Sequence, residues 1–220
     1  MKIRVEKNLS FLLLLALVLL SGCAAGVNVA SKPVVETAPI SEEPTVTRFE
    51  DGRRGFVLTE VSHLDGDARH DYEQAVTLLK SNDFEPAIEI LEKIVVLSPG
   101  VTAPYINLAI AYRNIGKLEP AEEHLKTALS LVPAHPVASN EYGLLLRKDG
   151  RFAEARNIYE QSVTKFPDYL PVRRNLGILC DLYLNDQECA LTQYEVYSAG
   201  SSENEQVKLW ITELRMRLGR

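Results

Sequence analysis

The chain has 220 residues, a formal net charge of −6 at pH 7 and three cysteines. A chain of this length has room for one domain of ordinary size together with a leader and a linker. Its acidic balance makes nucleic acid an unsuitable partner, because phosphates attract surfaces rich in lysine and arginine.

Residues 1–22 have the features of a signal peptide. Basic residues precede an apolar run at 11–20, which is too short to span a hydrocarbon core of ~30 Å. The run ends in LSGC at 20–23, which resembles the lipobox of bacterial lipoproteins. This resemblance implies cleavage before Cys23 and attachment of a diacylglycerol and an acyl chain such as palmitate to it. An ordinary secretory signal followed by an incidental cysteine is the alternative.

The same resemblance implies a location. Ala24 follows the cysteine where an aspartate would be the usual signal for retention in the inner membrane. We therefore expect the protein at the bacterial outer membrane, facing the periplasm. Several acyl chains on one residue make a stable membrane anchor, unlike a single chain.

Residues 23–50 are predicted to be the lipidated cysteine and a flexible tether, because prolines interrupt small and polar side chains without helical periodicity. Residues 51–67 are harder to assign. Gly55–Val61 is rich in β-forming residues and partly alternating, but no partner strand is evident. The segment is either an extended arm on the first repeat or more linker. If ordered, it would occupy a binding groove as an internal ligand.

The most regular stretch runs from Thr102 to His135. Apolar residues recur there at helical spacing in two runs, separated by Gly116, a residue that tolerates a helix C-terminal turn. Pro120 falls in the first turn of the second run, where its missing N–H costs nothing. One helical hairpin of this size cannot bury both apolar faces alone, so the chain is expected to repeat it.

The unit does repeat with a period of 34 residues. Prolines, small residues, large residues and turn residues each fall into register: Pro99, Pro133 and Pro167; Ala87, Ala121 and Ala155; Leu91, Leu125 and Tyr159; Asn82, Gly116 and Gly150. On these matches, residues 68–197 resemble tetratricopeptide repeats (TPRs).

The resemblance implies an all-α fold, a right-handed TPR α-solenoid of about four helix–turn–helix repeats. We place the repeats at 68–101, 102–135, 136–169 and 170–198, and a capping helix, apolar on one side, at 204–219. Asp83 and Asp168 are expected to cap helices. The fourth repeat is irregular, because its turn at 184–187 departs from the pattern in length and lacks the glycine.

Cys180 and Cys189 fall on the two antiparallel helices of this irregular repeat. In an oxidising periplasm a disulfide between them would staple the hairpin, contributing about 2–3 kcal/mol in the chain-entropy model. The alternative is a pair of buried cysteines that act as small hydrophobic residues. Because no histidine cluster accompanies them, we expect no metal site.

We find no motif that indicates catalysis. His63, His70, His124 and His135 are scattered without ligand spacing, and His124 is expected at the surface of a helix. The sequence has no nucleophile elbow, phosphate-binding glycine loop or zinc-protease motif. We therefore expect no enzymatic activity and no cofactor.

In TPR proteins the first helix of each repeat lines a concave groove, and the resemblance carries this role onto the matching positions here. The candidate partner-binding residues are Tyr72, Ile106, Asn107, Ile110, Arg113, Asn140, Leu144, Arg147, Arg174, Asn175 and Ile178. Asparagine can bond a peptide backbone and arginine can fork onto a carboxylate. The full TPR carboxylate clamp is not reproduced. The alternative is that Arg113 and Arg147 are merely the solvated ends of their helices.

The predicted function is a non-catalytic, lipid-anchored periplasmic adaptor for a protein or peptide partner in an envelope machine. The chain resembles pilotin-type and pilus-assembly TPR lipoproteins and TPR lipoproteins associated with TonB/ExbB energy transduction. The alternative is an accessory activator of a periplasmic cell-wall enzyme. The lipid would be its contact with the membrane, and the oligomeric state is left open.

Overall fold

The computed structural model describes residues 44–49, 55–60, 62–201 and 204–220. The signal peptide, Cys23 and most of the predicted tether lie outside these ranges, so the expectations for them stay predictions. Among the helices that are described, none is both long enough and apolar enough to cross a membrane.

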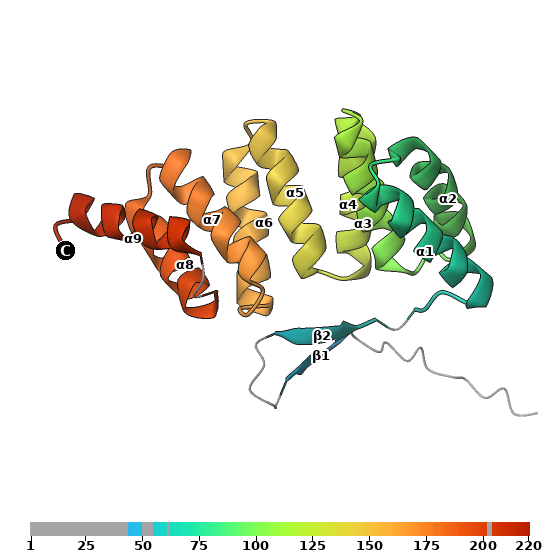
Figure 1. The fold of residues 1–220 in the computed structure, drawn as a ribbon, viewed down its shortest axis with the longest axis horizontal. Coiled ribbons are helices and arrows are strands. Elements are labelled where there is room, and N and C mark those ends of the chain that lie inside the picture. The colour runs from blue at the N-terminus through green and yellow to red at the C-terminus, as the bar shows by residue number, and fades with distance from the viewer. Residues whose placement is uncertain (1–43, 50–54, 61, 202–203) are drawn as a thin grey trace, which may run out of the picture. The chain divides into compact units, whose positions relative to one another are not determined.

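The described ranges contain nine helices and one pair of short strands (Figure 1). In chain order these are β1 (Thr45–Arg48), β2 (Phe56–Thr59), α1 (Gly66–Lys80), α2 (Phe84–Leu97), α3 (Thr102–Asn114), α4 (Leu118–Leu131), α5 (Pro136–Lys148), α6 (Phe152–Lys165), α7 (Leu170–Leu182), α8 (Gln187–Gly200) and α9 (Glu205–Arg217).

The helices form two layers. Each helix packs against its neighbours in sequence, and the odd helices α1, α3, α5 and α7 also contact one another in that order. No two even-numbered helices of the described chain make such contacts. The odd helices are therefore the closely spaced, inner layer of the stack, and the even helices α2, α4, α6 and α8 are the outer layer. This arrangement confirms the all-α solenoid that the period predicts.

The turns inside the repeats follow the predicted register. Asn82, Gly116 and Gly150 have φ angles of 65°, 81° and 76°, which lie in the left-handed region that glycine and asparagine tolerate best. The turn between α7 and α8 is one residue longer than the other three, and Asn185 takes the left-handed position there with φ 50°.

Tyrosines on the outer helices pack against glycines on the inner helices of the last two repeats. A Cβ atom on Gly143 would lie 2.2 Å from the ring of Tyr159, and one on Gly177 would lie 2.5 Å from the ring of Tyr194. Both tyrosines are buried. At the same register the first two repeats have alanine on the inner helix and leucine on the outer helix. The last two repeats therefore accommodate a larger outer side chain, tyrosine, by having a smaller inner residue, glycine.

The N-cap of α7 is not the expected residue, Asp168. The N-cap of α7 is Tyr169, which makes no side-chain cap bond, and Asp168 lies one residue further out. The Asp168 carboxylate instead accepts a hydrogen bond from Arg48 Nε at 2.7 Å. The predicted Asp168 cap is therefore wrong, because a cation from the N-terminal segment takes the carboxylate. Asp83 is the N-cap residue of α2, but its side chain makes no cap bond.

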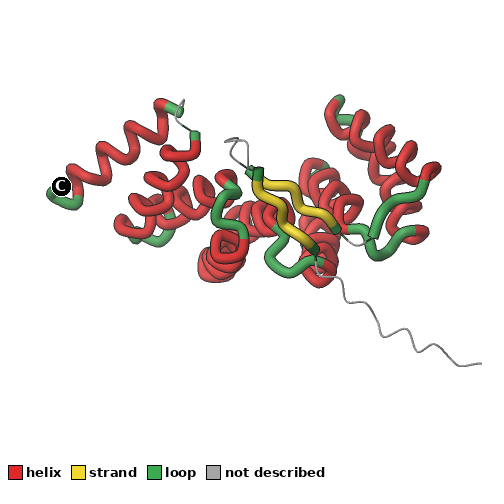
Figure 2. Tube along the Cα trace, turned by 90° about the horizontal axis from the view of Figure 1, so that it is seen from below, coloured by secondary structure: helices red, strands yellow, loops and turns green. Residues whose placement is uncertain are grey.

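The two strands lie side by side as a hairpin (Figure 2). They are antiparallel, and Val46 pairs with Leu58 and Arg48 with Phe56. The prediction of a flexible tether that extends to residue 50 is therefore wrong for residues 45–48, which form β1. In the predicted arm, residues 55–60 are ordered and include β2. β1 is four residues long and mostly polar, so its strand character depends on a partner that lies across a loop.

The hairpin does not lie along the predicted groove. Phe56 stacks on Phe166, with ring centroids 5.6 Å apart, and meets Tyr169 edge-on at 6.4 Å. Both partners lie in the loop between α6 and α7. The hairpin thus packs on the connections between repeats, and the expectation of an internal groove ligand is wrong.

Candidate protein-interaction surface

The inner helices bring the predicted groove residues onto one layer, but two of these residues are buried. Ile106 is 5% exposed and Asn140 is 8% exposed, because residues of the neighbouring helices cover them. Both stabilise the repeat stack and offer little surface to a partner. The other predicted residues are half-buried, except Arg174, which is exposed.

The predicted asparagines bond across neighbouring repeats. Asn107 Nδ2 donates to Tyr72 Oη at 2.9 Å, and Asn175 Nδ2 donates to Asn140 Oδ1 at 2.7 Å. Asn140 Nδ2 in turn donates to Glu141 Oε1 at 3.1 Å. These amides connect α1 to α3 and α5 to α7, so they have fewer free atoms for a peptide backbone than the sequence suggested.

Arg113 is paired with an acid of the next repeat. Its Nη2 atom lies 3.0 Å from Glu141 Oε2, and both side chains are largely buried, with 30% and 14% of their surface exposed. Arg113 is therefore neither a free peptide ligand nor a solvated helix end. It connects α3 to α5 on the inner layer.

Arg147 and Arg174 differ from the other described arginines, because neither makes a hydrogen bond or ion pair with any described residue. Arg147 Nη1 is buried without a hydrogen-bond partner, and its guanidinium carbon lies 5.7 Å from the centre of the Tyr183 ring. The arginines that do have an acceptor are Arg48, Arg69, Arg113, Arg151, Arg156, Arg173, Arg215, Arg217 and Arg220.

Three aliphatic side chains occupy the same register on the inner helices, and two of them are one helical turn from these arginines: Leu144 from Arg147 and Ile178 from Arg174. Ile110, Leu144 and Ile178 are each half-buried and come from α3, α5 and α7, at intervals of one repeat. Together with Arg147 and Arg174 they define what we call the inner surface. It combines an apolar stripe with two guanidinium groups that have no acidic partner in the described part of the chain.

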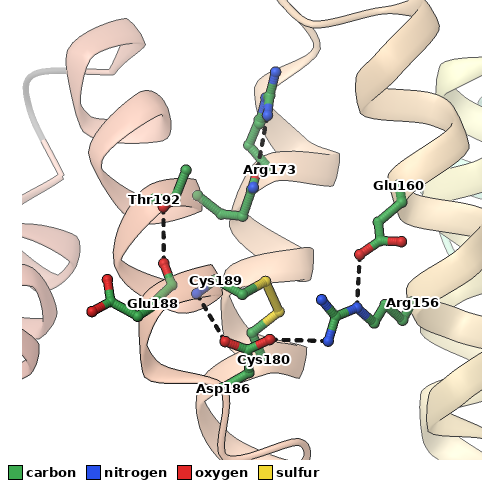
Figure 3. The surroundings of a disulfide bond; sticks show 9 residues. Arg156, Glu160, Arg173, Cys180, Asp186, Glu188, Cys189 and Thr192 are labelled. Carbon is green, nitrogen blue, oxygen red and sulfur yellow. Dashed lines mark hydrogen bonds and ion pairs between the residues drawn. A yellow bond between two sulfur atoms is a disulfide. The ribbon is translucent and has the colours of Figure 1, made fainter.

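The fourth repeat contains a disulfide between Cys180 and Cys189, whose Cα atoms are 5.9 Å apart (Figure 3). Asp186 lies beside it and accepts from the Cys189 N–H and from Arg156 Nη1, both at 3.0 Å. Two sulfur atoms and a carboxylate oxygen within 4.8 Å of one another would suit a metal ion. Because the sulfurs are bonded to each other, they are not available as thiolate ligands.

A polar cluster beneath the hairpin was missed by the sequence reasoning. His135 is 7% exposed, and its Nδ1 accepts from the Ala138 N–H at 3.2 Å as the N-cap of α5. Its Nε2 therefore carries the proton and lies 3.5 Å from Glu60 Oε1. Glu60 Oε2 also accepts from the Thr102 N–H at 3.1 Å, at the start of α3. One carboxylate thus connects the hairpin to two inner helices.

The cluster changes the acidity of its members. Burial raises the pKa of the Glu60 carboxyl, but the hydrogen bonds from His135 and Thr102 lower it more, so its pKa lies below the usual value. The sequence did carry one signal for this cluster, because His135 directly precedes Pro136, where the N-cap of a helix is expected.

His124 is half-buried and not at the surface as expected. It stacks on Tyr112 with ring centroids 5.6 Å apart, and burial lowers its pKa.

Comparisons with known proteins agree with this architecture. Residues 106–169 match the family model described as tetratricopeptide repeat. The structure of PilF from Pseudomonas aeruginosa is similar at 22% identity and a TM-score of 0.62, over 69% of each chain. MamA from Desulfovibrio magneticus RS-1 has 19% identity and a TM-score of 0.60, over 71% of this chain and 88% of that one.

A thermophilic TPR protein from Thermus thermophilus has 23% identity and a TM-score of 0.58, over 68% of this chain and 82% of that one. Identities in this range establish the fold. The tetratricopeptide-repeat model covers 106–169, and the solved structures show that the described helices share this fold.

Proposed function

We propose that this tetratricopeptide-repeat protein is a non-catalytic adaptor that binds a protein partner on its inner surface and is held at the bacterial outer membrane by lipid on Cys23. The observation that supports the binding role is the pair Arg147 and Arg174, which lack an acidic partner in the described chain. TPR folds present an extended concave surface to other proteins, which is consistent with this role.

The chemistry of the inner surface suits a peptide or a protein segment. Ile110, Leu144 and Ile178 offer apolar contact over three repeats, and a guanidinium can fork onto a carboxylate with two parallel hydrogen bonds. The neighbouring acid Glu141 is already paired with Arg113. A partner that carries acidic side chains would therefore supply the missing counter-charge.

A scaffold role fits the described residues better than catalysis. His135 is held between a backbone N–H and Glu60, and His124 stacks on Tyr112 and packs at a tilt against Tyr105, so neither is poised against a nucleophile. We propose that the adaptor serves pilus assembly or TonB-type energy transduction, on the sequence resemblance described above. Activation of a periplasmic cell-wall enzyme is the second candidate. The genes next to this one would distinguish these processes.

Affinity capture from detergent-solubilised membranes tests the binding role. The baits are the wild-type chain, the double variant Arg147→Glu/Arg174→Glu, and Lys93→Glu/Lys165→Glu. The last pair changes the charge equally but lies on the outer helices α2 and α6. We expect the inner double variant to lose the partner that wild type and the outer variant retain. Equal recovery by all three baits would refute binding at the inner surface.

A further inference from the structure

The turn between α7 and α8 has a surface that the other three turns lack. Leu182 is the last residue of α7 and is 69% exposed. Tyr183, which follows it, is 46% exposed. The same two register positions in the first three repeats carry mainly polar residues: Lys80 and Ser81, Asn114 and Ile115, Lys148 and Asp149.

The exposed tyrosine belongs to a small aromatic cluster. Its ring centroid lies 4.8 Å from that of Phe152, the first residue of α6. The Arg147 guanidinium lies over the same ring, 5.7 Å from its centre, within the range of a cation–π contact. We call Arg147, Phe152, Leu182 and Tyr183 the turn subsite. A single exposed leucine needs no explanation, but here it precedes an exposed ring that is covered by an arginine with no acidic partner among the described residues.

The acidic side chains near the turn subsite are already paired with other arginines. Asp181 bonds Arg217 of the capping helix at 3.0 Å, and Asp186 bonds Arg156 of α6 at the same distance. Glu141, on the helix that carries Arg147, is paired with Arg113. The positive charge of Arg147 is therefore not matched within the described chain, and it lies directly beside exposed apolar surface.

We propose that the turn subsite binds an acidic peptide segment of the partner in which a carboxylate lies next to an aromatic or aliphatic side chain. The apolar side chain packs on Leu182 and Tyr183, and the carboxylate bonds the Arg147 guanidinium. This assignment rests on the proposed function, since it gives the chemistry of the partner that the adaptor binds. It also explains why the fourth repeat departs from the polar pattern of the other three.

The arrangement selects against other peptides. A lysine or arginine next to the apolar side chain would meet Arg147 with like charge, and a neutral amide would lose the charge-assisted pair. The two exposed side chains form too small an apolar patch to indicate a membrane-binding face. The carboxylate and the apolar group must be adjacent, because Arg147 contacts the Tyr183 ring itself.

Selection from a phage-displayed library of random heptapeptides tests the proposal, with the full chain purified from membranes in detergent as the target. The peptide enriched on wild type is then measured by fluorescence polarisation, together with analogues in which its acid becomes the amide or its apolar residue becomes serine. The protein variants are Arg147→Gln and Leu182→Lys. The second of these gives the fourth repeat the lysine that the first and third repeats have at this register, Lys80 and Lys148. Leu209→Lys on α9 is the matched control, because Leu209 is 64% exposed and lies outside the subsite.

We expect enriched peptides to place aspartate or glutamate next to an aromatic or aliphatic residue. Arg147→Gln and Leu182→Lys should each weaken binding about tenfold, the loss typical of one charge-assisted pair or one apolar contact. Leu209→Lys should change the affinity less than twofold, and all variants should keep the wild-type circular dichroism spectrum.

Enriched peptides without this pairing, or an affinity that neither subsite variant changes, would overturn the subsite. If those peptides still lose binding to Arg174→Glu, the proposed inner surface stands and only the subsite fails. Failure to enrich any peptide would overturn both.

Discussion

Reduction of the bond between Cys180 and Cys189 should loosen the C-terminal part of the solenoid and leave the rest unchanged. The bond joins α7 to α8 across the longer turn, at a sequence separation of 9 residues. In the chain-entropy model a loop of this size restricts the unfolded hairpin by about 2.6 kcal/mol at 25 °C. Reduction should therefore make opening of this hairpin roughly 70-fold more frequent.

The effect should be local, because each repeat of a solenoid contacts only its neighbours. Helix α9 depends on the hairpin, since its Trp210 packs on Tyr194 of α8 with ring centroids 5.2 Å apart. Arg215 of α9 also bonds Glu195 of α8 at 2.7 Å. We expect faster opening in α7, α8 and α9, and unchanged opening in α1 to α4.

Hydrogen–deuterium exchange read by mass spectrometry, with and without a dithiol reductant, measures this difference. The variant Cys180→Ala/Cys189→Ala is the control, because the reductant should change none of its exchange rates. If exchange in α7 and α8 of the wild type does not respond to reductant, the bond does not stabilise the hairpin. Equal acceleration in every repeat would refute the local character of the effect.

Two further predictions rest on contacts described above, and a third rests on the predicted lipid anchor. Gly143→Ala should cost about 1–3 kcal/mol of unfolding free energy, because the new methyl group meets the buried Tyr159 ring; Gly66→Ala, with open space around its Cβ, should lower the melting temperature by no comparable amount. Glu60→Gln should destabilise by about 1–2 kcal/mol at neutral pH. Because the pKa of Glu60 is lowered on folding, this stabilisation is present above about pH 4.5 and lost as the pH falls through the folded pKa, so melts at pH 7 and pH 3 should show the deficit shrinking. Cys23→Ser should release the protein into the soluble fraction on cell fractionation, and retention in the membrane would refute the lipid anchor.

Local sequence signals predicted the repeats well. The period of 34 residues and the turn residues Asn82, Gly116 and Gly150 reflect constraints within one hairpin, namely helix periodicity and a left-handed turn position. The packing of Gly143 against Tyr159 follows the same register, since both residues fall at positions where the first two repeats have alanine and leucine.

Contacts between distant segments were not predictable in this way. The strand β1 exists through its pairing with β2 across a loop, and Arg48 bonds Asp168 at a distance of 120 positions in the sequence. In both cases neither partner alone indicates the other. For the same reason the cluster of Glu60 and His135 was missed. A carboxylate that caps a helix 42 residues away leaves no spacing motif in the sequence.

The sequence predicted which helix face carries the candidate surface, but not which of its side chains are exposed and unpaired. Repeat register places Ile106 and Asn140 on the inner layer correctly, yet the neighbouring helices bury both. Whether an arginine is free depends on which acid lies beside it in the next repeat. Glu141 is close enough to pair with Arg113, whereas Arg147 faces the ring of Tyr183.

Site-specific photo-crosslinking in cells shows directly whether a protein partner binds on the inner surface. A benzophenone amino acid replaces Leu144 on the inner helix α5 or Glu123, an exposed residue on the outer helix α4. We expect a crosslinked adduct to one partner protein from position 144 and none from position 123. An adduct from position 123 with none from position 144 would contradict binding on the inner surface.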